Sequence, residues 1–220
     1  MRRTLIASAL AIIGLALGCA NGTRGGQSAA SLKDAVEETL GAEGFHIQGV
    51  LTLEDTRIAA EGDYVSPDRL YMSASDGGTP TTTIMVGRNN YSSEPDDPET
   101  FSVWEMPCDV GVDTFIPALA VVRHAEDVQQ SRGAFTFRAD GNEGAPIEGQ
   151  ARVEGGYLVD LVLRYTLPRI NESVEERWTF SDFGTTARIE PPPREQVLDE
   201  SRFEGDPAII PNTGEPPACP

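Results

Sequence analysis

The sequence predicts an α+β protein built on one antiparallel sheet of about ten strands, with two or three helices. Residues 45–106 and 134–180 alternate between apolar and polar side chains, which is typical of strands with one buried face. The segments between them are short and rich in Gly, Pro, Asp and Asn. Such links are too short for parallel crossovers, so neighbouring strands must be antiparallel.

Two segments instead carry apolar residues at helical spacing, at 31–41 and at 113–126. In the first, Ser31 is a good N-cap residue, and Gly41 and Gly44 favour the end of a helix. In the second, Pro117 lies near the start, where proline is tolerated. A third, short helix is expected within 196–203. The apolar stripes of the first two helices consist of Leu32, Val36 and Leu40, and of Phe115, Leu119 and Val122.

The clearest predicted strand covers residues 157–167 and follows Gly155–Gly156, a strong hairpin signal. Strict alternation would place one set of its side chains on a single face. A second alternating set lies at 174–180. The two sets are Tyr157, Val159, Leu161, Leu163, Tyr165 and Leu167, and Val174, Trp178 and Phe180.

The N-terminus has the layout of an export signal. Arg2 and Arg3 precede an apolar run from Leu5 to Leu17, which is short for a transmembrane helix. The run ends at Gly18–Cys19 and resembles the lipobox of bacterial lipoproteins, in which the signal is cut before a cysteine that is then acylated. We therefore expect residues 1–18 to be a signal peptide, Cys19 to be lipidated, and residues 19–30 to be a flexible tether. The alternative is an uncleaved membrane anchor.

The net charge indicates which partners the chain can bind, and the cysteine content indicates how its cysteines are used. The formal net charge of the 220-residue chain is −18, so the surface repels nucleic acid and we exclude nucleic-acid binding. If Cys19 is acylated, Cys108 and Cys219 remain as a pair in an oxidising compartment, and we predict a disulfide between them. The alternative is two free thiols. The final segment, 194–220, is a Pro-rich extension.

We find no catalytic or metal-binding pattern and predict neither enzyme activity nor a metal or cofactor. His46 falls in a strand pattern and His124 on a helix, and each is expected to be structural. The acidic residues at 94–99 do not match the spacing of a calcium loop, and a solvated loop is the simpler reading.

Beyond the lipobox, three loose motifs carry a second resemblance to known lipoproteins, which covers most of residues 31–193. They are GDYVSPDRL at 62–70, IMVGRNNY at 84–91 with Trp104 following, and WTFSDFG at 178–184 continuing to Ile189. In these the chain resembles the lipoprotein-carrier superfamily typified by LolA and LolB, and more closely actinobacterial lipoproteins of the LppX/LprG type.

The resemblance implies a strongly curved sheet, an unclosed half-barrel, with helices on its concave face and an apolar cavity for acyl chains between them. It predicts an exported lipoprotein, held on the outer face of the cell membrane or, in a two-membrane cell, on the outer membrane. Its cargo would be a lipid or the acyl chains of a lipoprotein. Periodicity alone leaves open a filled core and a non-enzymatic scaffold that binds a protein partner. The candidate cavity residues are Ile84, Val86, Phe115, Leu119, Leu161, Leu163, Trp178 and Phe180.

Overall fold

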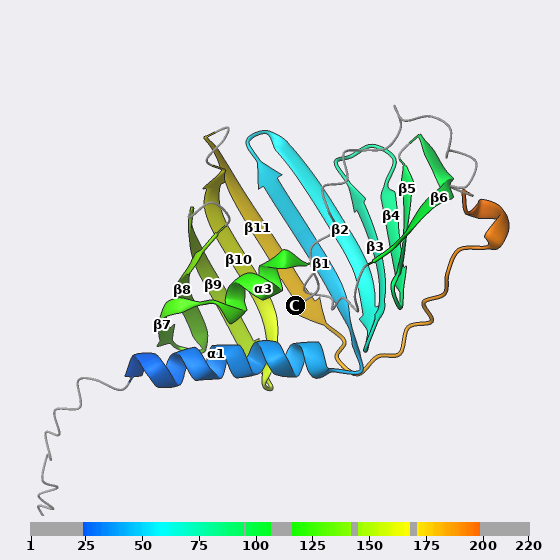
Figure 1. The fold of residues 1–220 in the computed structure, drawn as a ribbon. Helices are drawn as coiled ribbons and strands as arrows, with labels where there is room; N and C mark the ends of the chain where they lie inside the picture. Colours follow the sequence, from blue (N-terminus) through cyan, green and yellow to red (C-terminus); the bar gives the residue numbers. More distant parts are fainter. Residues whose placement is uncertain (1–23, 95, 107–115, 142–144, 168–170, 199–220) are drawn as a thin grey trace, which may run out of the picture.

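The structure is a computed structural model that describes residues 24–94, 96–106, 116–141, 145–167 and 171–198. One sheet of eleven strands, all paired antiparallel, runs through the molecule and does not close (Figure 1). This confirms the predicted open antiparallel sheet with helices. The strands β1 to β6 are Gly44–Leu53, Thr56–Val65, Arg69–Ser75, Thr81–Val86, Asn89–Glu94 and Asp97–Glu105. The strands β7 to β11 are Glu126–Ser131, Ala134–Asp140, Pro146–Glu154, Tyr157–Leu167 and Glu172–Ser181.

The sheet consists of two meanders joined at its centre. Strands β1 to β6 form one half in chain order and β7 to β11 form the other, so that β6 and β7 are the edges. The two halves meet where β1 pairs with β11, in a register that places Ile47 opposite Phe180. The first and the last of the described strands therefore form the middle of the sheet.

Two helices lie on one face of the sheet, which we call the inner face (Figure 1). Helix α1 (Arg24–Gly41) runs across one end of the strands, and helix α3 (Pro117–Arg123) lies over the β8–β11 side. Their buried residues Leu32, Val36 and Leu119 join one hydrophobic core with the inner-face side chains. The opposite face is called the outer face below.

Helix α1 begins at Arg24, ahead of the predicted start at Ser31, so part of the expected flexible tether is helical. Alanine has the highest helix propensity, and Ala29 and Ala30 directly precede Ser31. Conversely, the second helix ends at Arg123, and residues 126–131 form strand β7, which the apolar pattern did not predict because five of its six residues are polar. A single 3₁₀ turn covers Arg194–Gln196. Most of the expected third helix, from 199 to 203, lies outside the described residues.

A bulge in β10 changes the predicted face of its first residues. The register with β9 shifts between Leu158 and Asp160, so Leu158, rather than Tyr157 and Val159, faces inward with Leu161. The backbone N–H of Leu158 donates a 2.8 Å hydrogen bond to the hydroxyl of Thr39 in α1. This fully buried hydroxyl in turn donates to the carbonyl of Ala35, and the bulge thereby fixes α1 against the sheet.

Candidate functional site

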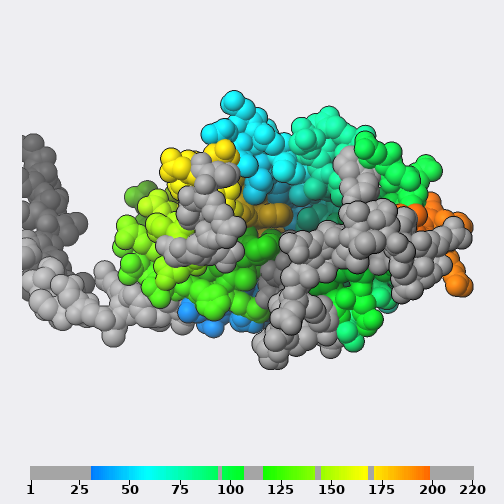
Figure 2. All heavy atoms as spheres, turned by 45° about the horizontal axis from the view of Figure 1, so that its top comes forward, coloured from blue at the N-terminus to red at the C-terminus, as the bar shows by residue number. Residues whose placement is uncertain are grey.

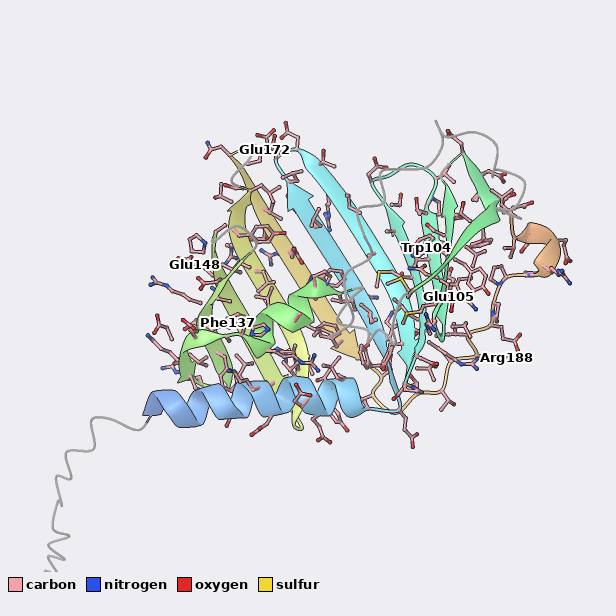
Figure 3. All side chains as sticks on the ribbon, in the orientation of Figure 1. Trp104, Glu105, Phe137, Glu148, Glu172 and Arg188 are labelled. Atoms are coloured by element: carbon pink, nitrogen blue, oxygen red, sulfur yellow. The ribbon has the colours of Figure 1, made fainter. Side chains whose placement is uncertain are left out.

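The inner face is apolar along most of its length. Alternation in β1 to β4 and β8 to β11 points leucine, isoleucine, valine, alanine, methionine and aromatic side chains to this side. In these strands only two charged residues occupy inner-face positions, Glu172 and Glu176. Glu172 stands at the outermost tip of β11 (Figure 3), whereas Glu176 lies within the apolar face.

The half of the inner face that lies beneath the helices is densely packed. Leu161, Leu163 and Phe180 are at most 1% exposed, and Leu119 of α3 is fully buried against the same cluster. At the central junction, Phe45 packs edge-on to Phe180 with 5.8 Å between the ring centroids. These side chains fill the space between helices and sheet.

The described residues cover the other half of the inner face less completely. Toward the β1–β2 turn and the β10–β11 connection, large apolar side chains remain partly exposed although they point to the same side as the core. Figure 2 shows the surface hollowed between β1–β3 and β10–β11, with gold atoms of β11 at the bottom of the hollow. We call this region the open half. Its partly exposed apolar residues include Leu51, Leu53, Ile58, Met72, Tyr165, Leu167 and Trp178.

Trp178 marks the boundary between the packed and the open half. Its ring lies over Gly49 of β1, where an added Cβ would meet ring atoms at 2.4 Å. Any larger residue at position 49 would therefore displace the indole. Gly49 lets a wide, flat aromatic side chain lie close to the strand, and the ring forms part of the floor of the hollow.

Two neutral donors hold the Glu176 carboxylate in the open half. The hydroxyl of Tyr165 donates to one carboxylate oxygen at 2.6 Å, and the indole N–H of Trp178 donates to the other at 2.9 Å. Burial, together with the hydrogen bond to Glu176, raises the pKa of Tyr165 well above its ordinary value, so the hydroxyl stays protonated. Within the described part of the chain, no Arg or Lys forms an ion pair with Glu176. Among the described residues, its carboxylate is therefore oriented by hydrogen bonds and paired with no Lys or Arg.

The neighbouring charges of the same strands belong to the outer face. Glu175 accepts hydrogen bonds from Arg177 at 2.6 Å and from Arg164 at 2.7 Å. These two guanidinium groups lower the pKa of Glu175 below its ordinary value. Consecutive glutamates in β11 thus have opposite environments, one paired with cations at the surface and one among apolar side chains.

The structure brings together five of the predicted cavity residues and separates two others from them. Leu119, Leu161, Leu163 and Phe180 belong to the packed half, and Trp178 lies at its edge. Ile84 and Val86 point to the outer face and pack with Phe101 and Ile189 in a second cluster. Phe115, Cys19, Cys108 and Cys219 lie outside the described residues.

The chain after β11 covers that second cluster. It runs back along the outer face, where Arg69 donates a 2.7 Å hydrogen bond to the carbonyl of Ile189, and Arg188 lies nearby in this segment (Figure 3). It then reaches the edge of the sheet, where Val197 forms a bridge with Phe101 of β6. Residues 185–198 therefore shield apolar side chains on the face opposite the described helices α1 and α3.

Sequence reasoning missed Glu176, Tyr165's partnership with it, and the open half. One signal was available, because the alternating set Val174, Trp178 and Phe180 skips position 176, where a glutamate occupies an apolar phase. No group of three or more His, Cys, Asp and Glu among the described residues is arranged to hold a metal ion. No helix in this part of the chain is long and apolar enough to cross a bilayer.

No protein-family model matches the sequence, and no curated protein matches it either. Among solved structures, the chain is similar to LprF from Mycobacterium bovis, with 15% identity and a TM-score of 0.42, over 78% of this chain and 99% of that one. It is also similar to a DUF1329 family protein from Desulfovibrio piger, with 9% identity and a TM-score of 0.34, over 81% and 97%. Similarity at this level concerns the fold and specifies no ligand.

Because one half of the inner face is fully packed and the other is partly exposed, a Leu→Ala substitution should lower the free energy of unfolding by different amounts in the two halves. Leu161→Ala should lower the free energy of unfolding by about 2–5 kcal/mol, since it opens a cavity in a fully packed region. Leu51→Ala, at a partly exposed position, should cost about 1 kcal/mol or less. Urea denaturation measures both values. Equal costs would mean that the two halves are packed alike.

Proposed function

We propose that the chain binds the acyl chain of a lipid, or of a lipoprotein, in the open half of its inner face and carries it within the cell envelope. The supporting observation is the contrast within one continuous apolar face, whose helix-covered half is filled while the other half keeps large apolar side chains partly exposed. Exposed apolar surface of this kind gains about 0.8 kcal/mol for each methylene group that it removes from water. An alkyl chain is the simplest ligand that covers it without requiring specific polar contacts.

The proposal places the ligand beside the core residues rather than among them. Leu119, Leu161, Leu163 and Phe180 leave no solvent-accessible surface for a ligand in the described structure, so they support the floor and do not line it. Trp178 contributes to both regions. The proposed contact surface is therefore formed by Leu51, Leu53 and Ile58 with the aromatic rings of Tyr165 and Trp178.

The proposal includes the attachment expected from the sequence. An acylated Cys19 would hold the domain on the outer face of a membrane, and a disulfide between Cys108 and Cys219 would join the region before α3 to the end of the chain. Two or more acyl chains suffice for stable anchoring. Mass spectrometry of the intact protein before and after reduction tests both modifications. A mass equal to the unmodified mature chain under both conditions would contradict them.

Binding is tested with N-phenylnaphthylamine, an uncharged apolar dye that becomes fluorescent in apolar surroundings. The mature chain carrying Cys19→Ala needs no detergent and should bind the dye. Ile58→Asp should weaken this binding about tenfold or more, because it places a carboxylate on the open apolar surface.

Ala59→Asp is the matched control, since its side chain lies on the outer face of the same strand and is exposed. It should leave dye binding unchanged. Circular dichroism confirms that both variants fold. If the parent chain binds no dye and purifies without lipid, the acyl-binding proposal fails, and the scaffold with a protein ligand is the better account.

A further inference from the structure

The position of Glu176 bears on which polar group the bound molecule carries. In β11, inner-face positions 174, 178 and 180 are Val, Trp and Phe, and across the strand pair the neighbours of Glu176 are Leu51 and Leu163. Placing a carboxylate at such a position has an energetic cost unless its charge is solvated or paired. The two hydrogen bonds from Tyr165 and Trp178 offset part of this cost without removing the charge.

The two donors also orient the carboxylate and leave part of its hydrogen-bond acceptor capacity unused. An ionised carboxylate accepts about four hydrogen bonds, of which the structure uses one at each oxygen. The remaining acceptor capacity is available to a ligand that lies over Trp178. Because both donors are held by packing against the core cluster, the acceptor is positioned before any ligand arrives.

The electrostatics of this face disfavour an anionic ligand. The other charged residue at an inner-face position of β1 to β4 and β8 to β11 is Glu172, also acidic, and no basic residue occupies such a position in those strands. Arg177 of the same strand and Arg164 of the paired strand β10 point to the outer face and are engaged by Glu175. A carboxylate or phosphate at the polar end of an alkyl chain would meet repulsion here, at reduced solvent screening.

We propose that the open half selects amphiphiles whose polar group donates hydrogen bonds and carries no negative charge, such as a hydroxyl or an amine, and that Glu176 accepts the hydrogen bond from that group. This inference rests on the proposed acyl-binding function and adds to it the class of head group. It assigns the apolar residues around Leu51 to the alkyl chain and Glu176 to the polar end.

The experiment compares three ligands with the same number of carbon atoms, namely dodecylamine, dodecanol and dodecanoate. Each displaces N-phenylnaphthylamine from the mature chain carrying Cys19→Ala, near neutral pH and below the concentration at which the ligand aggregates. Dodecylamine and dodecanol should each bind at least about tenfold more tightly than dodecanoate. Amine and alcohol are separate arms, because a cation adds charge attraction whereas a hydroxyl supplies only the hydrogen bond.

Glu176→Gln keeps the size of the side chain and one carbonyl acceptor but removes the charge. It should reduce the preference for dodecylamine over dodecanoate by about tenfold or more. The matched control is Glu175→Gln, which removes the same charge from the outer face of the same strand. It should leave the preference unchanged, because a general effect of the acidic surface would alter both variants alike.

The outcomes separate the two proposals. If no ligand displaces the dye, or the dye does not bind, the acyl-binding function fails together with this inference. If all three ligands bind equally, or dodecanoate binds best, acyl binding stands and the role of Glu176 is overturned. The same holds if the Gln variants at 175 and 176 behave alike. The ranking of ligands by the parent chain decides the question even if Glu176→Gln does not fold.

Discussion

How far the two helices cover the sheet governs the rest of the structure. Eleven strands spaced about 4.8 Å apart span about 50 Å, whereas the 18-residue helix α1 is about 27 Å long and the seven-residue α3 about 10 Å. Helix α1 lies across one end of the strands and α3 over the β8–β11 side (Figure 1). Apolar side chains beneath the helices are fully buried, and those toward the opposite strand ends, such as Leu51 and Ile58, remain partly exposed. An apolar face that continues beyond its cover is the physical basis for a ligand site.

The same sheet uses its outer face differently. There the chain that follows β11 covers Ile84 and Phe101 with Ile189, and its hydrogen bond from Arg69 fixes it in place. Charged pairs such as Glu175 with Arg177 occupy the outer face elsewhere. In the part of the chain that the structure describes, the inner face thus combines a large apolar area with a carboxylate, that of Glu176, which is oriented by hydrogen bonds and paired with no Lys or Arg. Its Glu176 differs from an ordinary buried acid because both of its donors are neutral.

Alternation in the sequence predicted the strands, because period two reports directly on which side chains share a face, and the short links predicted their antiparallel pairing. That the sheet stays open was expected only from the resemblance. Alternation could not predict which face the helices cover. In the run Ile84, Met85, Val86 every residue is apolar, so both faces of the strand qualify, and only the tertiary structure places Met85 inside and the other two outside. The bulge after Leu158 and the polar strand β7 were missed for a related reason, since both depend on contacts with α1 that lie far away in the sequence. The hydrogen bonds that Tyr165 and Trp178 donate to Glu176 join two strands. They depend on the register between these strands, which no local sequence pattern contains.

The central claim is that an alkyl chain occupies the open half and not the packed core. Methyl-resolved NMR of the protein with a nitroxide-labelled alkyl chain tests it most directly, because the unpaired electron broadens the signals of nearby methyl groups. Our account predicts broadening of the methyl signals of Leu51, Leu53 and Ile58, with those of Leu119 in α3 and Ile189 on the outer face much less affected. Broadening centred on Ile84 and Ile189, or none at any of these residues, would contradict it.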